Sequence, residues 1–404
     1  EMINYLNAEK VGDEELVVLG PSMGGLIARY GLAYMEQNSI PHETRLYISF
    51  DSPHIGANIP ISLQYLINYF AQEIGDATAL AIVEDVLFSP AAKEMLSDHL
   101  LAHLLAGSTF EQDPTKLLPE GAPGFRDEFQ SELDAIGFPQ NVRNVTMING
   151  SGNATTTGSP DAVVVDTNLT IDALTDVDVA LRFTPAASQT NTVTDLTAYF
   201  IGLPVATFTA DAESPATSDG TDSSPGGTAS ISDALGDGGG NPVLEQFIAA
   251  LEQDLYSFIP TMSALAIDNE NLYEVPNLND SPFVNYYIPN ENEDHVTVTG
   301  PSAQFALDEI RQGQLSISEI NNNQRFIIAP NPVGETIRIS TMETLGDRDV
   351  QVAIYSLTGQ LISDKMMEIS SGTIEIEHRL TPGLYTLAIK AGANTTHLKA
   401  VVKN

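Results

Sequence analysis

A Gly-x-Ser-x-Gly motif, Gly20 to Gly24, stands between a short β-branched stretch and a helical apolar pattern, and it restricts the fold more than any other feature. So tight a turn from strand to helix leaves no room for side chains at residues 20 and 24, and it lifts the Ser22 hydroxyl clear of the sheet edge. Free N–H groups at the helix start face that hydroxyl. We therefore predict a nucleophilic Ser22, with the Met23 N–H as half of an oxyanion hole. The alternative is an ordinary glycine-rich turn.

A second buried strand is predicted over residues 45–50, and it ends in the loop Asp51-Ser52-Pro53-His54-Ile55-Gly56. Strand, turn, helix and strand in this order form the middle of a doubly wound sheet, whose sites lie beyond the carboxyl ends of its strands. Here the chain resembles the α/β-hydrolase fold, in particular its lipase and esterase branch. The resemblance implies that His54 shapes the loop near the site and is not the catalytic histidine.

The catalytic base is expected late in the chain, because this fold orders its triad as serine, acid, histidine. His295 follows a polar loop and precedes a helical pattern at residues 303–310, where the family places its base. The alternative for His295 is an exposed loop histidine. His99 and His103 are spaced as on a helix surface, and no carboxylate completes a metal site there. The remaining histidines are His42, His378 and His397.

The acid, which must orient the imidazole, is harder to choose because carboxylates are abundant. The segment 258–268 resembles the late strand and loop that carry the acid in bacterial lipases, although Tyr256-Ser257 replaces the usual Asp-Gly. Asp268 is therefore the first candidate and Asp254 the second. Asp161 and Asp280 remain open, whereas Asp294 is too close to His295 in sequence for their side chains to converge.

The charge of the chain is uneven, which predicts a domain boundary. Residues 1–324 hold 9 Lys and Arg against 46 Asp and Glu and carry the whole net charge of −37, whereas residues 325–404 hold 8 of each. Such a charge opposes binding to nucleic acid. With no cysteine there is no disulfide or thiolate site, and no stretch approaches the roughly 20 apolar residues of a membrane span. The sequence predicts neither a cofactor nor a metal.

The last 80 or so residues form a module of short alternating strands separated by turn residues, which predicts a small antiparallel sandwich. Its motifs, in order, are Pro330-Asn331-Pro332, residues 354–360 (Ile-Tyr-Ser-Leu-Thr-Gly-Gln), residues 382–385 (Pro-Gly-Leu-Tyr) and residues 399–403 (Lys-Ala-Val-Val-Lys). They resemble the C-terminal sorting domain of type IX secretion cargo from Bacteroidetes. The resemblance implies export to the cell surface or the medium, with the secretion machinery as partner. A carbohydrate-binding or adhesive β-sandwich is the alternative.

The predicted architecture is a partial doubly wound α/β-hydrolase sheet with cap helices over residues 1–315, a linker over 316–324 and an Ig-like sorting domain over 325–404. Helical patterns at residues 61–71, 78–87 and 91–105 lie where this fold inserts its cap, and core packing is the alternative. An insertion is predicted at 151–240, with strands at 179–183 and 197–209 in a hairpin. Its end, residues 214–240, is predicted as a long exposed loop without a calcium-loop pattern.

Only about 14 residues precede the first strand, whereas the fold places several strands before the nucleophile, one of them leading to the second oxyanion donor. The expectation is therefore an N-terminally truncated piece of a larger exported hydrolase, inactive if its oxyanion hole is incomplete.

The predicted function is hydrolysis of carboxylic esters by a secreted, lipase-like serine hydrolase that uses Ser22, His295 and Asp268 on an acyl-ester or lipid substrate. A non-catalytic surface or adhesion protein on the same fold is one alternative. An amidase or peptidase with the same triad is another, because the triad does not choose between ester and amide.

Overall fold

The computed structural model describes residues 1–235, 241–316, 326–328, 333–334, 336–341, 349–356, 360–369, 372–391 and 394–403. The chain divides into two compact units, Glu1–Gly313 and Gln314–Asn404. The linker predicted over 316–324 lies, from residue 317 on, outside the described residues, as does the Pro330-Asn331-Pro332 motif.

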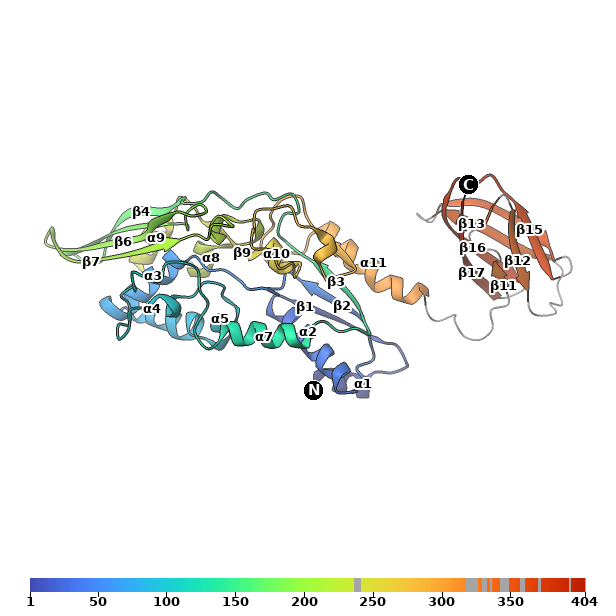
Figure 1. Cartoon of the computed structure of the whole chain (residues 1–404), viewed down its shortest axis with the longest axis horizontal. Helices are drawn as coiled ribbons and strands as arrows, with labels where there is room; N and C mark the ends of the chain where they lie inside the picture. The colour runs from blue at the N-terminus through green and yellow to red at the C-terminus, as the bar shows by residue number, and fades with distance from the viewer. Residues whose placement is uncertain are drawn as a thin grey trace. The chain divides into compact units, whose positions relative to one another are not determined.

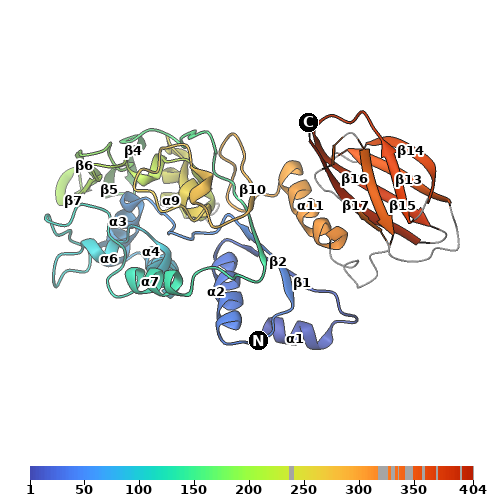
Figure 2. The ribbon, with the colours of Figure 1, turned by 45° about the vertical axis from the view of Figure 1, so that its right-hand side comes forward.

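A parallel sheet of four strands in the order β1-β2-β3-β10 organises the first unit. Its strands are β1 (Leu16–Pro21), β2 (Thr44–Phe50), β3 (Arg143–Met147) and β10 (Asn285–Tyr287). Alternate residues of β2 face opposite sides: Ile48 packs toward α11 (Gly300–Ser316), and Tyr47 packs toward α2 (Met23–Gln37). Figure 2 shows these two helices on opposite sides of the sheet. The fold class is therefore mixed α/β, and the carboxyl ends of the strands meet at one edge.

Between β2 and β3 the chain forms short helices, which Figure 1 places beneath the long strands of the insertion. The elements before the sheet and in this segment are α1 (Met2–Glu9), α3 (Ile61–Tyr69), α4 (Ala77–Ile82), α5 (Pro90–Met95), α6 (Leu100–His103) and α7 (Arg126–Ile136), with π-helical turns at Phe70–Ile74 and Val83–Leu87. The helical patterns predicted at 61–71, 78–87 and 91–105 thus form helices broken into shorter pieces. Ser89 caps α5 through its side chain, and Pro90 occupies the first turn of that helix.

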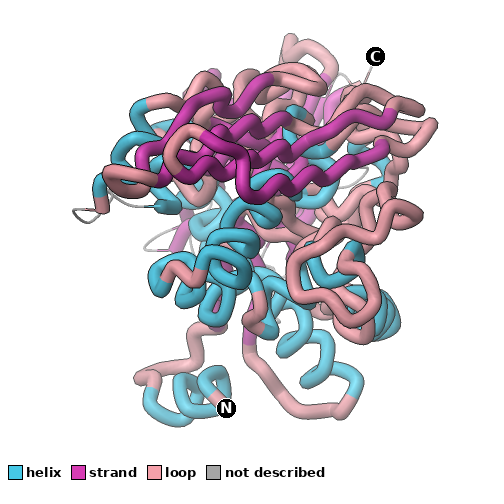
Figure 3. Tube along the Cα trace, turned by 90° about the vertical axis from the view of Figure 1, so that its left-hand side faces the viewer, coloured by secondary structure: helices cyan, strands magenta, loops and turns pink. Residues whose placement is uncertain are grey.

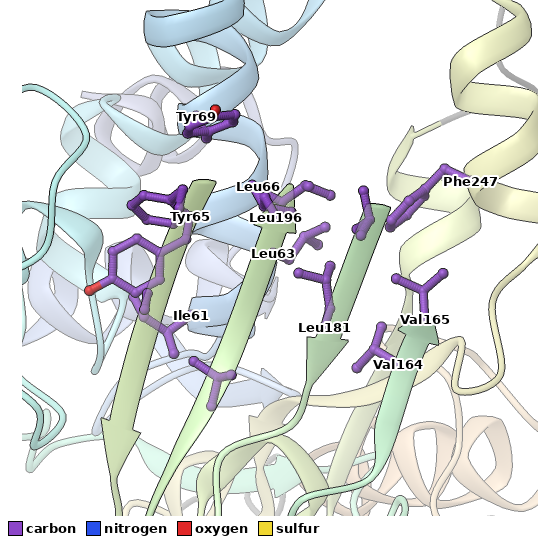
Figure 4. Close-up of a cluster of buried hydrophobic side chains, with 14 of the residues drawn as sticks. Ile61, Leu63, Tyr65, Leu66, Tyr69, Val164, Val165, Leu181, Leu196 and Phe247 are labelled. Carbon is purple, nitrogen blue, oxygen red and sulfur yellow. The ribbon is translucent and has the colours of Figure 1, made fainter. Parts of the chain in front are cut away.

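The insertion forms an antiparallel sheet of four strands in sequence order, where a single hairpin was predicted. The strands are β4 (Val163–Thr170), β5 (Thr175–Arg182), β6 (Thr190–Phe200) and β7 (Leu203–Glu213). They form one layer above the helices in Figure 3. The inner face of this sheet packs on α3, and Figure 4 shows Tyr65 and Leu66 of that helix beside Leu196 of the sheet. Among the described residues this apolar contact forms the largest buried cluster of the unit, and it joins the sheet β4–β7 to α3.

The segment 214–240 was predicted as an exposed loop from its Ser, Asp and Gly content. For residues 214–235 this prediction was wrong. The segment forms a 3-10 turn (Thr221–Ser223), β8 (Gly226–Ser230) and α8 (Ile231–Leu235), and residues 222–228 are all buried. Asp222 accepts hydrogen bonds from Asn58 Nδ2 (2.9 Å) and from Thr184 N–H (2.8 Å). Satisfied polar groups of this kind can be buried, so composition alone misjudged the segment. Residues 236–240 lie outside the described residues.

The segment after the insertion returns the chain to the parallel sheet. Here β8 pairs antiparallel with β9 (Leu255–Pro260), and α9 (Pro242–Ala249) and α10 (Thr261–Ala264) flank β9. Asn241 caps α9 through its side chain. β8 also lies close to the carboxyl edge of the parallel sheet, since a Cβ at Gly227 would lie 2.9 Å from Cγ of Asp51, the residue after β2.

The second unit is strand-rich, with two antiparallel sheets ordered β11-β12-β15 and β14-β13-β16-β17. Its strands are β11 (Phe326–Ile328), β12 (Thr336–Thr341), β13 (Asp349–Ser356), β14 (Leu361–Glu368), β15 (Thr373–Glu377), β16 (Gly383–Ala391) and β17 (Asn394–Val402). Side chains from both sheets, among them Ile337 and Leu387, share one buried cluster. The alternating burial of β12 and β15 explains why the sequence pattern located these strands.

Helix α2 allows a matched test of the packing around the β1–α2 turn. A Cβ added at Gly25 would lie 2.8 Å from Ser52 Cβ, and closer still to Ser52 Oγ, whereas a Cβ at Gly31 of the same helix meets nothing within 4 Å. We predict that Gly25→Ala lowers the free energy of unfolding by about 1–3 kcal/mol through overpacking. We predict that Gly31→Ala raises it by up to about 1 kcal/mol through helix propensity. Urea unfolding measures both, and equal effects of the two substitutions would refute the packing account.

Candidate active site

Ser22 lies at the turn between β1 and α2 with φ 51° and ψ −131°, a conformation that costs a non-glycine residue energy. Its N–H donates to Phe50 O (2.8 Å), which fixes the turn to the end of β2. A Cβ at Gly20 would lie 2.5 Å from Gly24 C, so residue 20 must be glycine, as predicted. At Gly24 the prediction was wrong, because a Cβ there meets only Pro21 Cδ at 3.4 Å. The second crowded position is Gly25.

His295 lies on the loop between β10 and α11, and its Nε2 is 2.9 Å from Ser22 Oγ. Its N–H donates to Thr228 O (2.8 Å), so β8 holds the backbone of this loop. The Phe258 ring meets the imidazole edge-on, with 4.9 Å between the ring centroids. The side chain of His295 is 16% exposed, which leaves the imidazole accessible from one side.

Asp51, the residue directly after β2, completes a line of three side chains. Its Oδ2 lies 2.7 Å from His295 Nδ1, and its side chain is 0% exposed. Because an ionised carboxylate only accepts, Nδ1 carries the proton and Nε2 can accept one from the Ser22 hydroxyl. Asp51 has φ 47°, a second strained non-glycine residue at the same sheet edge. The three residues follow one another in the order Ser22, Asp51, His295.

The contact expected of Asp268 is therefore made by Asp51, and Asp268 itself is exposed on the loop after α10. Asp254, the second candidate, accepts hydrogen bonds from Ser230 and Ser232 instead. The other carboxylates considered also bind elsewhere: Asp161 pairs with Arg182, Asp280 accepts from Asn277, and Asp294 accepts from Thr228.

A signal for Asp51 was present in the sequence. In the parallel register Pro21 pairs with Phe50, so the residues that follow them, Ser22 and Asp51, meet at the sheet edge. The pattern that the sequence reasoning missed is an acidic residue directly after β2, the strand that pairs with the strand leading to Ser22.

Asn149, two residues after β3, and Gly227 of β8 surround the Asp51 carboxylate. The Asn149 N–H donates to Asp51 Oδ1 (3.0 Å), and Asn149 Nδ2 donates to Glu293 Oε2 and to Thr297 O, both at 2.9 Å. One residue thus joins the carboxylate to the loop that carries His295. At Gly227 a Cβ would lie 2.9 Å from Asp51 Cγ and closer still to Oδ2, so β8 approaches the carboxylate through a glycine.

The other histidines take no part in this line. His54 is fully buried and lies 2.9 Å from Ser49 Oγ, and burial lowers the pKa of its imidazole well below the usual range. His99 and His103 are buried, contrary to the expected helix surface. His99 Nε2 donates to Leu87 O (2.8 Å), and His103 Nε2 lies 2.6 Å from Asp98 Oδ1. His42 lies near Glu36.

Within the described part of the chain no group of three or more His, Asp or Glu side chains is arranged to hold a metal ion. No helix in that part is both long and apolar enough to span a bilayer.

Comparison with known families identifies both ends of the chain. Residues 1–84 match the family model described as "Putative serine esterase", and residues 327–403 match the model described as "Secretion system C-terminal sorting domain". The chain thus has an N-terminal domain of serine-esterase type and a C-terminal type IX sorting domain. This confirms the resemblance of the C-terminal segment to a sorting domain and, for the N-terminal segment, the resemblance to serine esterases. The sorting domain marks a protein secreted to the cell surface or the extracellular space.

Comparison with individual proteins adds little. No curated protein sequence matches this chain. Dimeric latent PorU from Porphyromonas gingivalis is 24% identical over 19% of this chain and 9% of its own, with a TM-score of 0.16. A Salmonella alpha-2-macroglobulin mutant is 11% identical over 61% of this chain and 12% of its own, with a TM-score of 0.18. The chain thus spans a small part of either protein, and neither informs its fold.

The close approach at Gly227 predicts a spectroscopic effect. Gly227→Ala forces the Asp51 carboxylate to move, so we expect the downfield Nδ1–H proton of His295 in the NMR spectrum to shift or disappear. Gly300→Ala, at an open position where a Cβ meets nothing within 4 Å, is the matched control and should leave this proton unchanged. An unaltered Nδ1–H signal in Gly227→Ala would contradict the geometry.

Proposed function

We propose that this protein is a secreted serine hydrolase of the α/β-hydrolase type that cleaves carboxylic esters with the triad Ser22, His295 and Asp51. The observation that supports the proposal most directly is the line of contacts from Ser22 Oγ to His295 Nε2 (2.9 Å) and from His295 Nδ1 to Asp51 Oδ2 (2.7 Å). The serine-esterase match over residues 1–84 includes both Ser22 and Asp51.

In the proposed reaction Ser22 Oγ attacks the acyl carbon while His295 Nε2 takes its proton. The imidazolium then donates that proton to the oxygen of the leaving alcohol, and the acyl group remains on Ser22 as an ester. Water, deprotonated by His295, then attacks this ester, and the imidazolium returns the proton to Ser22 Oγ as the acid is released. Asp51 keeps the imidazole in the required tautomer and stabilises its charged form.

The developing oxyanion needs donors beside Ser22. Met23 is the first residue of α2, so its N–H has no partner carbonyl one turn earlier within the helix. We propose that this N–H stabilises the oxyanion, a contribution worth about 3–4 kcal/mol when a single donor is removed.

A lipase-like preference for an apolar acyl group is the finer part of the proposal. Its support is the apolar character of the surroundings: the Phe258 ring lies against His295, and Phe258 also borders the large core shared by α3 and the insertion. An anionic acyl group would be disfavoured there, because the first unit carries a strong negative charge.

We predict that a fluorophosphonate probe labels the natural secreted protein on Ser22 and that Ser22→Ala abolishes the label. Asp51→Asn should slow p-nitrophenyl ester hydrolysis about 10³- to 10⁴-fold, because the imidazole loses its orienting acceptor. Asp268→Asn is the matched control at an exposed aspartate and should retain activity within about twofold.

Labelling that survives Ser22→Ala, or a larger loss in Asp268→Asn than in Asp51→Asn, would refute this triad. If the folded protein hydrolyses no ester of any chain length, the non-catalytic surface or adhesion protein is favoured. If it cleaves p-nitroanilides in preference to esters, an amidase is favoured.

A separate prediction concerns the second unit. Deleting residues 325–404 should leave a folded esterase that accumulates in the periplasm, because the sorting domain is an address that plays no part in the proposed chemistry. Cell fractionation with an ester assay checks this. Normal amounts of the truncated enzyme in the medium would contradict the role of these residues in sorting.

A further inference from the structure

The turn between β6 and β7 exposes a continuous apolar segment that the catalytic proposal does not use. Its side chains are Phe200, Ile201, Leu203 and Val205, with exposed fractions of 46%, 66%, 69% and 63%. Leu174, in the neighbouring turn between β4 and β5, is 51% exposed and accepts a hydrogen bond from Ile201 N–H (2.7 Å). Five apolar residues from two turns therefore meet at one end of the sheet, and we call them the apolar tip.

The turn at the apolar tip has a backbone conformation that isoleucine disfavours, so isoleucine does not contribute to the stability of this turn. Phe200 pairs with Leu203, so the turn has two central residues, Ile201 and Gly202, with φ of 50° and 73°. Two positive φ values favour Asn-Gly at such positions, and a β-branched residue is the least suitable first member. Isoleucine here costs folding energy in both backbone conformation and exposed apolar surface, which is typical of a residue kept for function.

The charges around the apolar tip restrict what can bind to it. Neither β6 nor β7 contains a lysine or arginine, and Arg182 is the sole basic residue of β4 and β5, at the end of β5 away from the tip. Acidic residues, by contrast, stand near the tip, among them Asp172 and Asp176. Anionic lipid headgroups would be repelled by these carboxylates and would gain no compensating contact. An uncharged or zwitterionic surface is free of that penalty.

The apolar tip is also placed to reach an extended surface. Figure 1 shows β6 and β7 extending beyond the neighbouring helices at the left of the view. A protruding hairpin suits insertion into a deformable apolar phase rather than a rigid groove. A cavity of about 120 Å³ is lined mostly by apolar side chains, including Leu66 of α3, Ile171 of the turn between β4 and β5, and Phe247 of α9. Ile171 and Leu174 belong to the same turn, so the cavity and the apolar tip lie at the same end of the insertion.

We infer that the apolar tip anchors the enzyme on a lipid surface without net charge, so that the insertion is a lipid-docking module. This inference rests on the proposed function in one respect, since it names the physical form of the ester substrate: a lipid aggregate and not a dissolved ester. Docking itself needs no catalysis and can be measured in the Ser22→Ala variant.

The decisive variant is Ile201→Asn, which removes an anchoring side chain and creates the turn sequence that this backbone prefers. In a flotation assay with phosphatidylcholine vesicles we expect the wild-type chain to bind and Ile201→Asn to bind at least about tenfold more weakly. We expect the thermal unfolding temperature of the variant to be unchanged or higher, so a folding defect cannot explain lost binding. Hydrolysis of p-nitrophenyl acetate, a dissolved substrate, should stay within twofold of the wild type.

A direct readout of insertion uses the absence of tryptophan from this chain. Leu203→Trp introduces a single indole at the apolar tip without altering the Ile-Gly turn, and its emission should shift to the blue when phosphatidylcholine vesicles are added. Val275→Trp, at a residue 65% exposed elsewhere on the unit, is the matched control and should show no shift.

Several outcomes would overturn the inference. They are failure of the wild type to bind phosphatidylcholine vesicles, binding only to a second set of vesicles rich in phosphatidylglycerol, and equal binding of wild type and Ile201→Asn. A blue shift in Val275→Trp as large as that in Leu203→Trp would also overturn it. A chain that self-associates through the apolar tip without binding vesicles would show that a second copy covers it. If vesicles bind as expected but no ester is cleaved, the proposed function fails and the docking role stands.

Discussion

The carboxyl edge of the parallel sheet is packed so closely that glycine is required at three positions. A Cβ at Gly20 would meet the backbone of Gly24, one at Gly25 would meet Ser52, and one at Gly227 would meet the Asp51 carboxylate. These contacts hold β1, α2, β2 and β8 within van der Waals distance of each other. The strained backbones of Ser22 and Asp51 persist because the surrounding packing leaves no alternative.

This packing places three side chains from distant parts of the sequence in one line. The register of β1 on β2 brings the residues after Pro21 and Phe50 together, and Asn149 follows the next strand of the same sheet. The loop after β10 is held to β8 through the backbone of Thr228 and to Asn149 through Glu293. His295 therefore reaches both Ser22 and Asp51 although more than two hundred residues separate it from either.

The parts of the site with local sequence signatures could be predicted. Ser22 lies in a five-residue motif with a strand before it and a helix after it, and His295 precedes a clear helical pattern. Asp51 has no such local signature, because its contact with His295 depends on which strands are neighbours in the sheet. Asp268 was preferred instead because segment 258–268 resembles the acid-bearing region of bacterial lipases, although Tyr256-Ser257 replaces the Asp-Gly of that region. Burial was misjudged in the same way: His99, His103 and the residues around Asp222 look polar but have their hydrogen bonds satisfied inside the protein.

The central claim is that Ser22, His295 and Asp51 act as one unit, and a double-mutant cycle on labelling of Ser22 by a fluorophosphonate tests it most directly. The second-order rate constant would be measured for the wild type, His295→Ala, Asp51→Asn and the double variant. If Asp51 acts only through the imidazole, its substitution has no further effect once His295 is gone, and the double variant labels at the rate of His295→Ala. Multiplicative losses, in which Asp51→Asn slows His295→Ala by the factor it imposes on the wild type, would contradict the account.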